Sequence, residues 1–192
     1  TYTFTALDAT GNCPVDETII LSEPNELILT TDVFQDIQCF GANDGSIEIT
    51  ISGGLGNNSI TWTKDGNPFS TLEDISSLSA GNYVLVIEDG IANSCSVSQT
   101  YTITEPTEFS VTLNNKIDLS CFGGIDGEIN VSVVGGTPIP GNPNQYQFDW
   151  VHDSGATYTA EDLTSIPAGT YNLTVTDANG CTDTLQVTLT QP

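Results

Sequence analysis

The sequence has almost no positive charge. Its 192 residues include 2 Lys and Arg taken together and 1 His, against 25 Asp and Glu, for a formal net charge of −23 at pH 7. A surface of this sign repels phosphate backbones and anionic lipid headgroups, so nucleic acid is excluded as a partner. The same charge keeps long arrays of the protein apart and soluble.

Long apolar runs are missing too. No stretch approaches the roughly 18 apolar residues of a membrane-spanning helix, and no basic segment followed by an apolar one opens the chain. The sequence therefore predicts neither direct membrane insertion nor a signal peptide within these residues. We expect the export signal to be encoded elsewhere.

Catalytic motifs are absent as well. His152 stands two positions after Trp150 with no nucleophile at a suggestive spacing, and the chain has no phosphate-binding glycine loop, histidine-based zinc pattern or nucleophile elbow. The Gly-Gly pairs at 53–54 and 135–136 stand at predicted strand ends, where a bulge or tight bend explains them. The sequence predicts a protein that is not an enzyme.

What the sequence does contain is an internal repeat. One ending occurs three times, with a cysteine 11 positions before a proline, over 13–24, 95–106 and 181–192. One beginning occurs twice, as CFGANDGSIEI from Cys39 and CFGGIDGEINV from Cys121. The cysteines of successive endings lie 82 and 86 positions apart, which is near the length of one immunoglobulin-like sandwich.

The repeat predicts an all-β chain of tandem immunoglobulin-like β-sandwich repeats. Residues 1–24 would be the C-terminal strands of a preceding repeat, 25–106 the first full unit and 107–192 the second. Two strands alone would leave an open apolar face, so we expect the chain to be a piece of a longer polypeptide.

Period-2 alternation marks the strands, as in Ile47, Ile49 and Ile51, where polar residues stand between the apolar ones. Trp62 and Trp150 fall on the third strand of each unit, where an aromatic side chain is expected to fill the space between two sheets. The strands predicted for the first unit are 27–38, 46–52, 58–64, 70–75, 82–88 and 96–104.

The repeated phrases resemble a known family. CFGANDGSIEITISGG, LSAGNYVLVIEDG and IPAGTYNLTVTDANGC, with their EP or QP endings, look like SprB repeats of very large surface adhesins in gliding Bacteroidetes. The resemblance covers 27–192 as two units and 1–24 as part of a third. It implies export by type IX secretion, an extracellular position at the cell surface, and a structural role in an adhesin filament used in adhesion or gliding motility.

The partners implied by that role are neighbouring repeats of the same chain, and surface polysaccharide or a substratum. The second unit departs from the first by a longer loop over 137–149, where ligand preference would differ. The alternative function is a carbohydrate-binding or accessory repeat module of a secreted enzyme. A sugar-binding face would need exposed aromatic residues, for which Tyr146, Phe148 and Tyr158 are the candidates.

Five cysteines at regular positions of a secreted β-protein argue for structural disulfides. In a sandwich, the two cysteines of one unit lie in turns at opposite ends, roughly 25 Å apart, whereas a disulfide joins Cα atoms about 4.4 to 6.8 Å apart. This geometry favours a bond between units, Cys39 with Cys181, and leaves the partners of Cys13, Cys95 and Cys121 outside the chain. The alternative is pairing inside each unit, Cys39 with Cys95 and Cys121 with Cys181.

Acidic and amide side chains accompany these cysteine turns. Oxygen atoms of this kind are the ligands of calcium, which stiffens tandem extracellular domains, so calcium is a candidate cofactor between units. Asp-Gly is also an ordinary turn dipeptide that needs no ion. The candidate calcium ligands are Asp44, Asp89, Asp126, Asp177, Asn179 and Asp183.

One further site is a candidate for modification. Asp183-Thr184-Leu185 fits a short Asp-Thr-apolar pattern that resembles Bacteroidetes O-glycosylation sites. We expect Thr184 to carry a sugar in the native protein.

Overall fold

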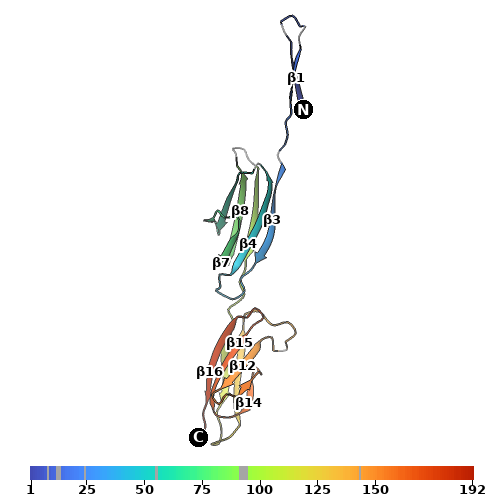
Figure 1. Cartoon of the computed structure of the whole chain (residues 1–192). Coiled ribbons are helices and arrows are strands. Elements are labelled where there is room, and N and C mark those ends of the chain that lie inside the picture. The colour runs from blue at the N-terminus through green and yellow to red at the C-terminus, as the bar shows by residue number, and fades with distance from the viewer. Residues whose placement is uncertain (8, 12–13, 24, 55, 91–94, 143) are drawn as a thin grey trace.

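The computed structural model describes residues 1–7, 9–11, 14–23, 25–54, 56–90, 95–142 and 144–192. These residues form strands and no helix, so no helix in the described chain has the length and apolar character of a membrane span. Figure 1 shows an extended arrangement, in which a two-stranded hairpin, a first sandwich and a second sandwich follow one another from one end to the other.

Each sandwich has a three-stranded sheet facing a four-stranded sheet. In the first sandwich the sheet orders are β3-β4-β7 and β6-β5-β8-β9, and in the second they are β10-β11-β14 and β13-β12-β15-β16. The first sandwich is made of β3 (Asn25–Gln35), β4 (Gly45–Gly54), β5 (Asn58–Lys64), β6 (Asn67–Ser70), β7 (Ile75–Leu78), β8 (Gly81–Asp89) and β9 (Ser96–Ile103). The second is made of β10 (Ser110–Ile117), β11 (Gly127–Val134), β12 (Gln147–His152), β13 (Thr157–Tyr158), β14 (Leu163–Ile166), β15 (Gly169–Thr176) and β16 (Thr182–Leu189).

The two sandwiches have separate cores built from the same alternation. In β4, Ile47 and Ile49 are buried, whereas the residues between them face outward. Because strand side chains alternate between faces, a period-2 apolar pattern supplies one buried face per strand. The first core draws its buried residues from Leu27 to Ile103, and the second from Val111 to Leu189.

The two tryptophans fill the centre of their sandwiches, as predicted. Trp62 and Trp150 are both fully buried. Each indole Nε1–H donates to a backbone carbonyl ten positions later, Trp62 to Leu72 O at 2.9 Å and Trp150 to Ala160 O at 3.0 Å. The ring therefore packs the core while its one polar atom holds the crossing segment between the sheets.

In the first sandwich this crossing segment lies between Ser70 and Ile75, where one strand was predicted wrongly. Residues 70–75 do not form a single strand, because β6 ends at Ser70 in the four-stranded sheet and β7 begins at Ile75 in the three-stranded sheet. The chain changes sheets between them, where Asp74 Oδ1 accepts from Ile49 N at 2.9 Å. A change of sheet leaves no periodic signal in so short a segment, so the sequence pattern could not separate the two strands.

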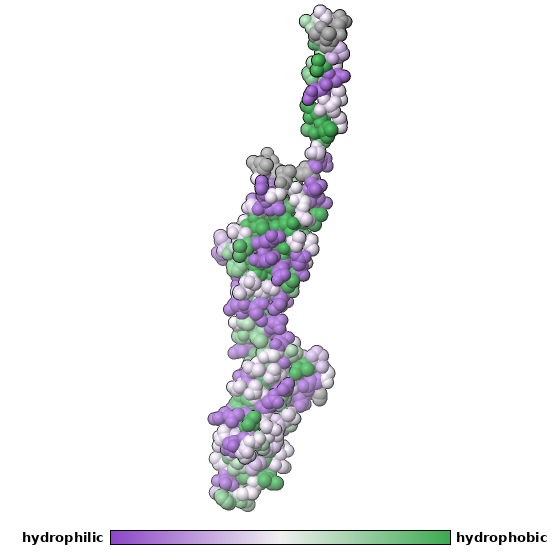
Figure 2. Space-filling model, viewed as in Figure 1, coloured by the Kyte–Doolittle hydropathy of each residue, from purple (hydrophilic) through white to green (hydrophobic). Residues whose placement is uncertain are grey.

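The hairpin at the start of the chain repeats the final hairpin of each sandwich. β1 (Tyr2–Ala6) pairs with β2 (Val15–Ile19) in antiparallel register, as β8 pairs with β9 and β15 with β16. Tyr2 is 65% exposed, whereas its counterparts Tyr83 and Tyr171 are fully buried. Figure 2 shows apolar residues gathered along this hairpin.

Candidate functional site: the junction between the sandwiches

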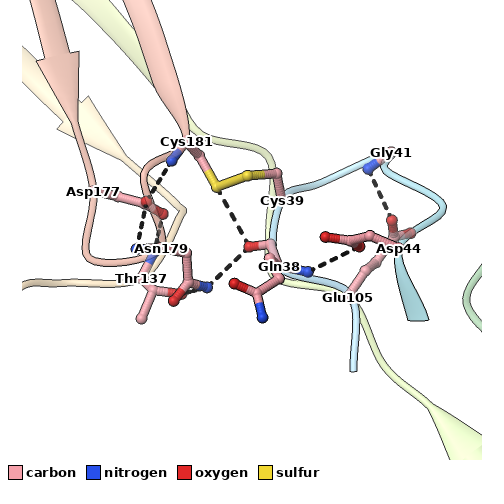
Figure 3. The surroundings of a disulfide bond; sticks show 9 residues. All are labelled: Gln38, Cys39, Gly41, Asp44, Glu105, Thr137, Asp177, Asn179 and Cys181. Atoms are coloured by element: carbon pink, nitrogen blue, oxygen red, sulfur yellow. Dashed lines mark hydrogen bonds between the residues drawn. A yellow bond between two sulfur atoms is a disulfide. The ribbon is translucent and has the colours of Figure 1, made fainter. Parts of the chain in front are cut away.

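The first half of the junction is the loop that follows β3, over residues 36–44. Ile37 N donates to Thr104 O at 3.0 Å, and Thr104 N donates to Asp36 Oδ1 at 2.6 Å, which ties the loop to the end of β9. Gly41 N also donates to Glu105 Oε2 at 3.0 Å. These bonds hold the loop on its own sandwich, with Cys39 at its outer edge (Figure 3). We call residues 36–44 the first docking loop.

The second half is the turn between β15 and β16, which is organised by a buried carboxylate. Asp177 is buried and accepts three backbone N–H groups, from Thr137 at 2.8 Å, Asn179 at 2.9 Å and Cys181 at 2.8 Å. Hydrogen bonds to an ionised acceptor are the stronger kind, and a buried carboxylate needs them to offset its lost hydration. Asp177 therefore places Cys181 and Asn179 on the surface that faces the first sandwich.

A disulfide joins the two halves. Cys39 and Cys181 form the bond across a Cα separation of 5.7 Å and a sequence separation of 142. Beside it, Asn179 Nδ2 donates to Gln38 O at 2.9 Å, and Cys181 Sγ lies 3.3 Å from the same oxygen (Figure 3). A covalent bond and a directional hydrogen bond thus act at adjacent positions, which restricts rotation of one sandwich against the other.

This bond is the pairing between units that the turn geometry favoured. The alternative pairing inside units does not occur for Cys39 or Cys181, because each is bonded to the other. Cys95 and Cys121 are exposed and carry free thiols. Cys13 lies outside the described residues, so the partners of Cys13, Cys95 and Cys121 stay predictions.

A small hollow of about 290 Å³ lies at the junction, lined by residues of both sandwiches. Phe40 and Cys39 contribute from the first docking loop, and Glu108, Phe109 and Cys181 are among the residues that contribute from the second sandwich. Sequence reasoning missed the apolar part of this contact. The available signal was the phenylalanine that directly follows the first cysteine of both units.

The Gly-Gly pairs belong to the same end of each sandwich. At Gly135, a Cβ atom would lie 1.8 Å from Glu108 O, and at Gly136 it would lie 2.9 Å from Asp177 Oδ2. Both residues also have positive φ, of 73° and 62°, which favours glycine. Glycine is therefore required here because the strand end approaches the linker and the carboxylate closely. This is a more specific reason than the bulge or tight bend expected from the sequence.

The carboxylates proposed for calcium are divided among several places. Asp44 Oδ1 accepts from Gln38 N at 3.2 Å, Asp126 accepts from Ser120 N, and Asp183 Oδ2 accepts from Val111 N at 2.8 Å. A hydrogen bond from Ser120 is the main cause that lowers the pKa of Asp126.

These acids act as acceptors for backbone N–H groups, the role that turn chemistry assigns to aspartate. Asp44, Asp177, Asn179 and Asp183 lie toward the Cys39–Cys181 junction, whereas Asp89 lies beside Cys95 and Asp126 beside Cys121. Within the described ranges, no group of three or more His, Cys, Asp or Glu side chains is arranged to hold a metal ion. Calcium stays a prediction.

His152 has a packing environment. It is buried, its Nδ1 lies 2.7 Å from Ser154 Oγ, and its ring packs against Tyr171 in a tilted arrangement at a centroid distance of 4.5 Å. The position is occupied in the first sandwich by Lys64, whose Nζ lies 5.5 Å from the centre of the Tyr83 ring. A basic group over a tyrosine is thus a feature of both sandwiches, and burial raises the pKa of Tyr171.

The aromatic candidates for sugar binding are only partly accessible. Phe148 is buried, and Tyr146 donates its hydroxyl to Gly135 O at 2.8 Å while it packs on Phe109. Tyr158 is half-buried beside Tyr171. Tyr146 and Phe148 are nevertheless among the residues that line a surface hollow, so the sugar-binding role stays a prediction.

Thr184 lies on β16 with its side chain exposed. Its neighbours Asp183 and Leu185 are half-buried, which places the Thr184 side chain on the outer face of the strand. The Thr184 side chain is thus accessible to a glycosylating enzyme. Glycosylation of Thr184 stays a prediction.

Comparison with known proteins accounts for the repeat. Residues 31–67 and 113–150 match the sequence model of the SprB repeat. Two segments of the chain, one in each sandwich, therefore match the SprB repeat. Among curated proteins, no sequence matches this chain.

Solved structures that resemble this chain include tandem immunoglobulin domains. The amphioxus IgVJ-C2 molecule is 16% identical with a TM-score of 0.34, over 88% of this chain and 99% of that one. Sidekick-1 immunoglobulin domains 1–5 are 9% identical with a TM-score of 0.45, over 99% of this chain and 46% of that one.

SGBP-B of the Bacteroides ovatus mixed-linkage glucan utilization locus, solved in complex with a mixed-linkage heptasaccharide, is 14% identical with a TM-score of 0.30, over 88% of this chain and 72% of that one. These similarities concern the fold alone. The predicted class, an all-β chain of tandem immunoglobulin-like sandwiches, is confirmed by the strand content and by the sheet orders that the two sandwiches share.

Proposed function

We propose that this chain is a structural segment of a secreted cell-surface adhesin filament that serves adhesion or gliding motility. Its units would be residues 25–106 and 107–192, with 1–24 as the closing strands of a preceding repeat. The observation that carries the proposal is the disulfide between Cys39 and Cys181, which links one sandwich to the next. A filament that projects from a surface needs this kind of link, because a rod resists bending and compression whereas a flexible string does not.

Three further features support a rod outside the cell. Disulfides persist in oxidising surroundings, which fits export of the protein. Pro106 stands in the linker between the sandwiches and fixes its own φ near −65°, which limits bending there. The net charge of −23 keeps neighbouring filaments apart.

The stiffness is tested by small-angle X-ray scattering of the full chain before and after reduction. We expect the oxidised chain to hold one long, narrow distribution of interatomic distances, and the reduced chain and the Cys39→Ser variant to give a broader distribution with a shorter mean. Cys121→Ser is the matched control, since Cys121 has no disulfide. Identical scattering in all four samples would show that the disulfide does not set the shape.

The cellular role is tested with antibodies against the purified chain. They should label intact cells that make the protein and should reduce attachment to surfaces or gliding speed. Labelling that appears only after the cells are lysed would contradict a surface filament.

A second candidate, a carbohydrate-binding module, is favoured by one observation. The longer loop of the second sandwich borders a hollow of about 460 Å³, lined by residues that include Asn142, Asn144, Gln147 and Asp149. Amide and carboxylate groups suit sugar hydroxyls. Binding of the full chain to a glycan array that is lost in an Asn142→Ala variant would support this function. An array without signal would contradict it and would leave only the structural role in a filament. If the full-length protein has a catalytic domain beside a few repeats, the repeats would instead be an accessory module of a secreted enzyme.

A further inference from the structure

The loop after β10 in the second sandwich repeats the first docking loop. We call residues 118–126 the second docking loop. Leu119 N donates to Thr190 O at 3.0 Å, as Ile37 N does to Thr104 O. Gly123 N donates to the side chain of Gln191 at 2.8 Å, as Gly41 N does to Glu105. The same backbone therefore presents Cys121 as it presents Cys39.

The second docking loop is uncovered. Phe122 is 82% exposed, whereas its counterpart Phe40 is 51% exposed at the existing junction. Ile125 is 66% exposed, and the thiol of Cys121 is exposed and free. A thiol flanked by an exposed aromatic and an exposed aliphatic side chain forms an unpartnered contact surface at this end of the chain.

The opposite half of a junction is repeated in the first sandwich. Beside Cys95 lies a hollow of about 280 Å³ whose lining includes Glu26, Leu27 and Asp89. Asp89 N donates to Cys95 O at 3.0 Å, as Asp177 N does to Cys181 O.

The glycine pair next to this hollow has the same close approaches as the pair in the second sandwich. A Cβ at Gly53 would lie 1.8 Å from Glu26 O, and a Cβ at Gly54 would lie 2.9 Å from Asp89 Oδ2. The surface that receives a docking loop at Cys181 is thus also present at Cys95.

We propose that the second docking loop and the hollow at Cys95 are each half of a further junction of the Cys39–Cys181 type, and that the partner is another unit of this same repeat. Cys121 bonds the counterpart of Cys181 in a following unit, and Cys95 bonds the counterpart of Cys39 in a preceding one. The proposal rests on the filament function and names its partner. Because each junction joins two different surfaces, every added unit leaves one further half-junction open, and the contact can be repeated from unit to unit.

The bond forms by thiol–disulfide exchange. Each junction loses two S–H protons and two electrons, which a small-molecule disulfide such as oxidised glutathione accepts as it becomes two thiols. The docking contact brings the two cysteines together, as the Asn179 to Gln38 bond does at the existing junction. Contact through Phe122 then determines which thiol Cys121 meets.

The test lengthens the full chain by a second copy of its own residues 107–192, placed after Pro192. Gln191-Pro192-Thr107 then reproduces the Glu105-Pro106-Thr107 linker. The protein is oxidised in a glutathione buffer, its remaining thiols are alkylated, and its disulfides are mapped by mass spectrometry. We expect Cys121 of the original chain to be linked to Cys181 of the added copy, and to stay alkylated in the chain of 192 residues.

A Phe122→Ser variant separates docking from chance oxidation. Its core is unchanged, since Phe122 is exposed, and we expect the Cys121 bond to form at least tenfold more slowly while the Cys39 bond forms at its usual rate. A free Cys121 in the lengthened chain, a link to another cysteine, or no effect of Phe122→Ser would overturn the proposal. If the Cys39 bond itself fails to form, the filament function fails with it, and the two results are therefore distinguishable.

Discussion

The disulfide between Cys39 and Cys181 should remove most of the chain from mechanical load. Force applied to the two ends travels along the shortest covalent path, which runs from Cys39 through the two sulfur atoms to Cys181. The segment that this path bypasses contains strands β4 to β15, the greater part of both sandwiches. Only residues 1–39 and 181–192 remain in line with the force.

The size of the effect follows from the sequence separation. At about 3.3 to 3.6 Å per extended residue, the 142 positions between the two cysteines amount to about 470 to 510 Å of chain. The bridge itself replaces this length with a Cα separation of 5.7 Å. The fully stretched oxidised chain should therefore be shorter than the reduced chain by close to the whole of that length.

The assay is single-molecule force spectroscopy on the full chain held by its ends. We expect the oxidised chain to extend without releasing the length of a sandwich, and the reduced chain or the Cys39→Ser variant to release about 470 to 510 Å more as the sandwiches unfold. Cys121→Ser is the control and should behave like the unmodified chain. Equal stretched lengths with and without reductant would refute the reasoning, because force would then pass through the sandwiches in both cases.

Four other predictions can be tested, three from the structure and one, on calcium, from the sequence. Trp150→Ala should destabilise the second sandwich by about 3 to 5 kcal/mol in urea unfolding followed by circular dichroism, while Trp62 fluorescence shows that the first sandwich unfolds unchanged. Equal loss in both would contradict separate cores. Asp177→Ala leaves three backbone N–H groups without their acceptor, should cost about 1 to 3 kcal/mol, and should slow formation of the Cys39–Cys181 bond in a timed thiol-trapping assay; an unchanged rate would count against its role.

The pKa of Asp118 is lowered from 3.8 chiefly by the hydrogen bond from the Thr190 backbone, so its contribution to stability is present above pH 3.8 and is lost as pH falls through the lower folded value. An NMR titration should give a midpoint below 3.8, and Asp118→Asn should remove that acid dependence; a midpoint at the ordinary value would oppose the assignment. If calcium binds, the melting temperature of the full chain should rise on addition of the ion and fall with a chelator. An unchanged melting temperature in both conditions would contradict a calcium site.

Much of the fold could be predicted from spacing alone. The alternation of Ile47 and Ile49, and the recurrence of Trp62 at Trp150, reflect a two-sided strand geometry that any sandwich of this length shares. The strand predicted over 70–75 was wrong because β6 and β7 are too short to show a period and the chain changes sheets between them. Local pattern determines which residues face inward, whereas it does not determine to which sheet a short strand pairs.

The candidate site was less accessible to sequence reasoning. Asp177 and Asn179 were expected as calcium ligands, and the structure uses them to hold backbone N–H groups and Gln38 O. An aspartate oxygen serves a cation or an amide equally well, so residue type does not decide between the two roles. The contribution of Phe40 to the junction appears only when both sandwiches are placed.

The amino-acid sequence by itself determined that this protein is acidic, repetitive and built from β-sandwich units, because charge, period and strand alternation are properties of order along the chain. It also reduced the pairing of the cysteines to two alternatives, inside units or between them, and the distance between the ends of a sandwich favoured the bond between units. Only the tertiary structure decided that Cys39 meets Cys181 across 142 positions, because a 5.7 Å approach depends on how two separate cores are set against each other.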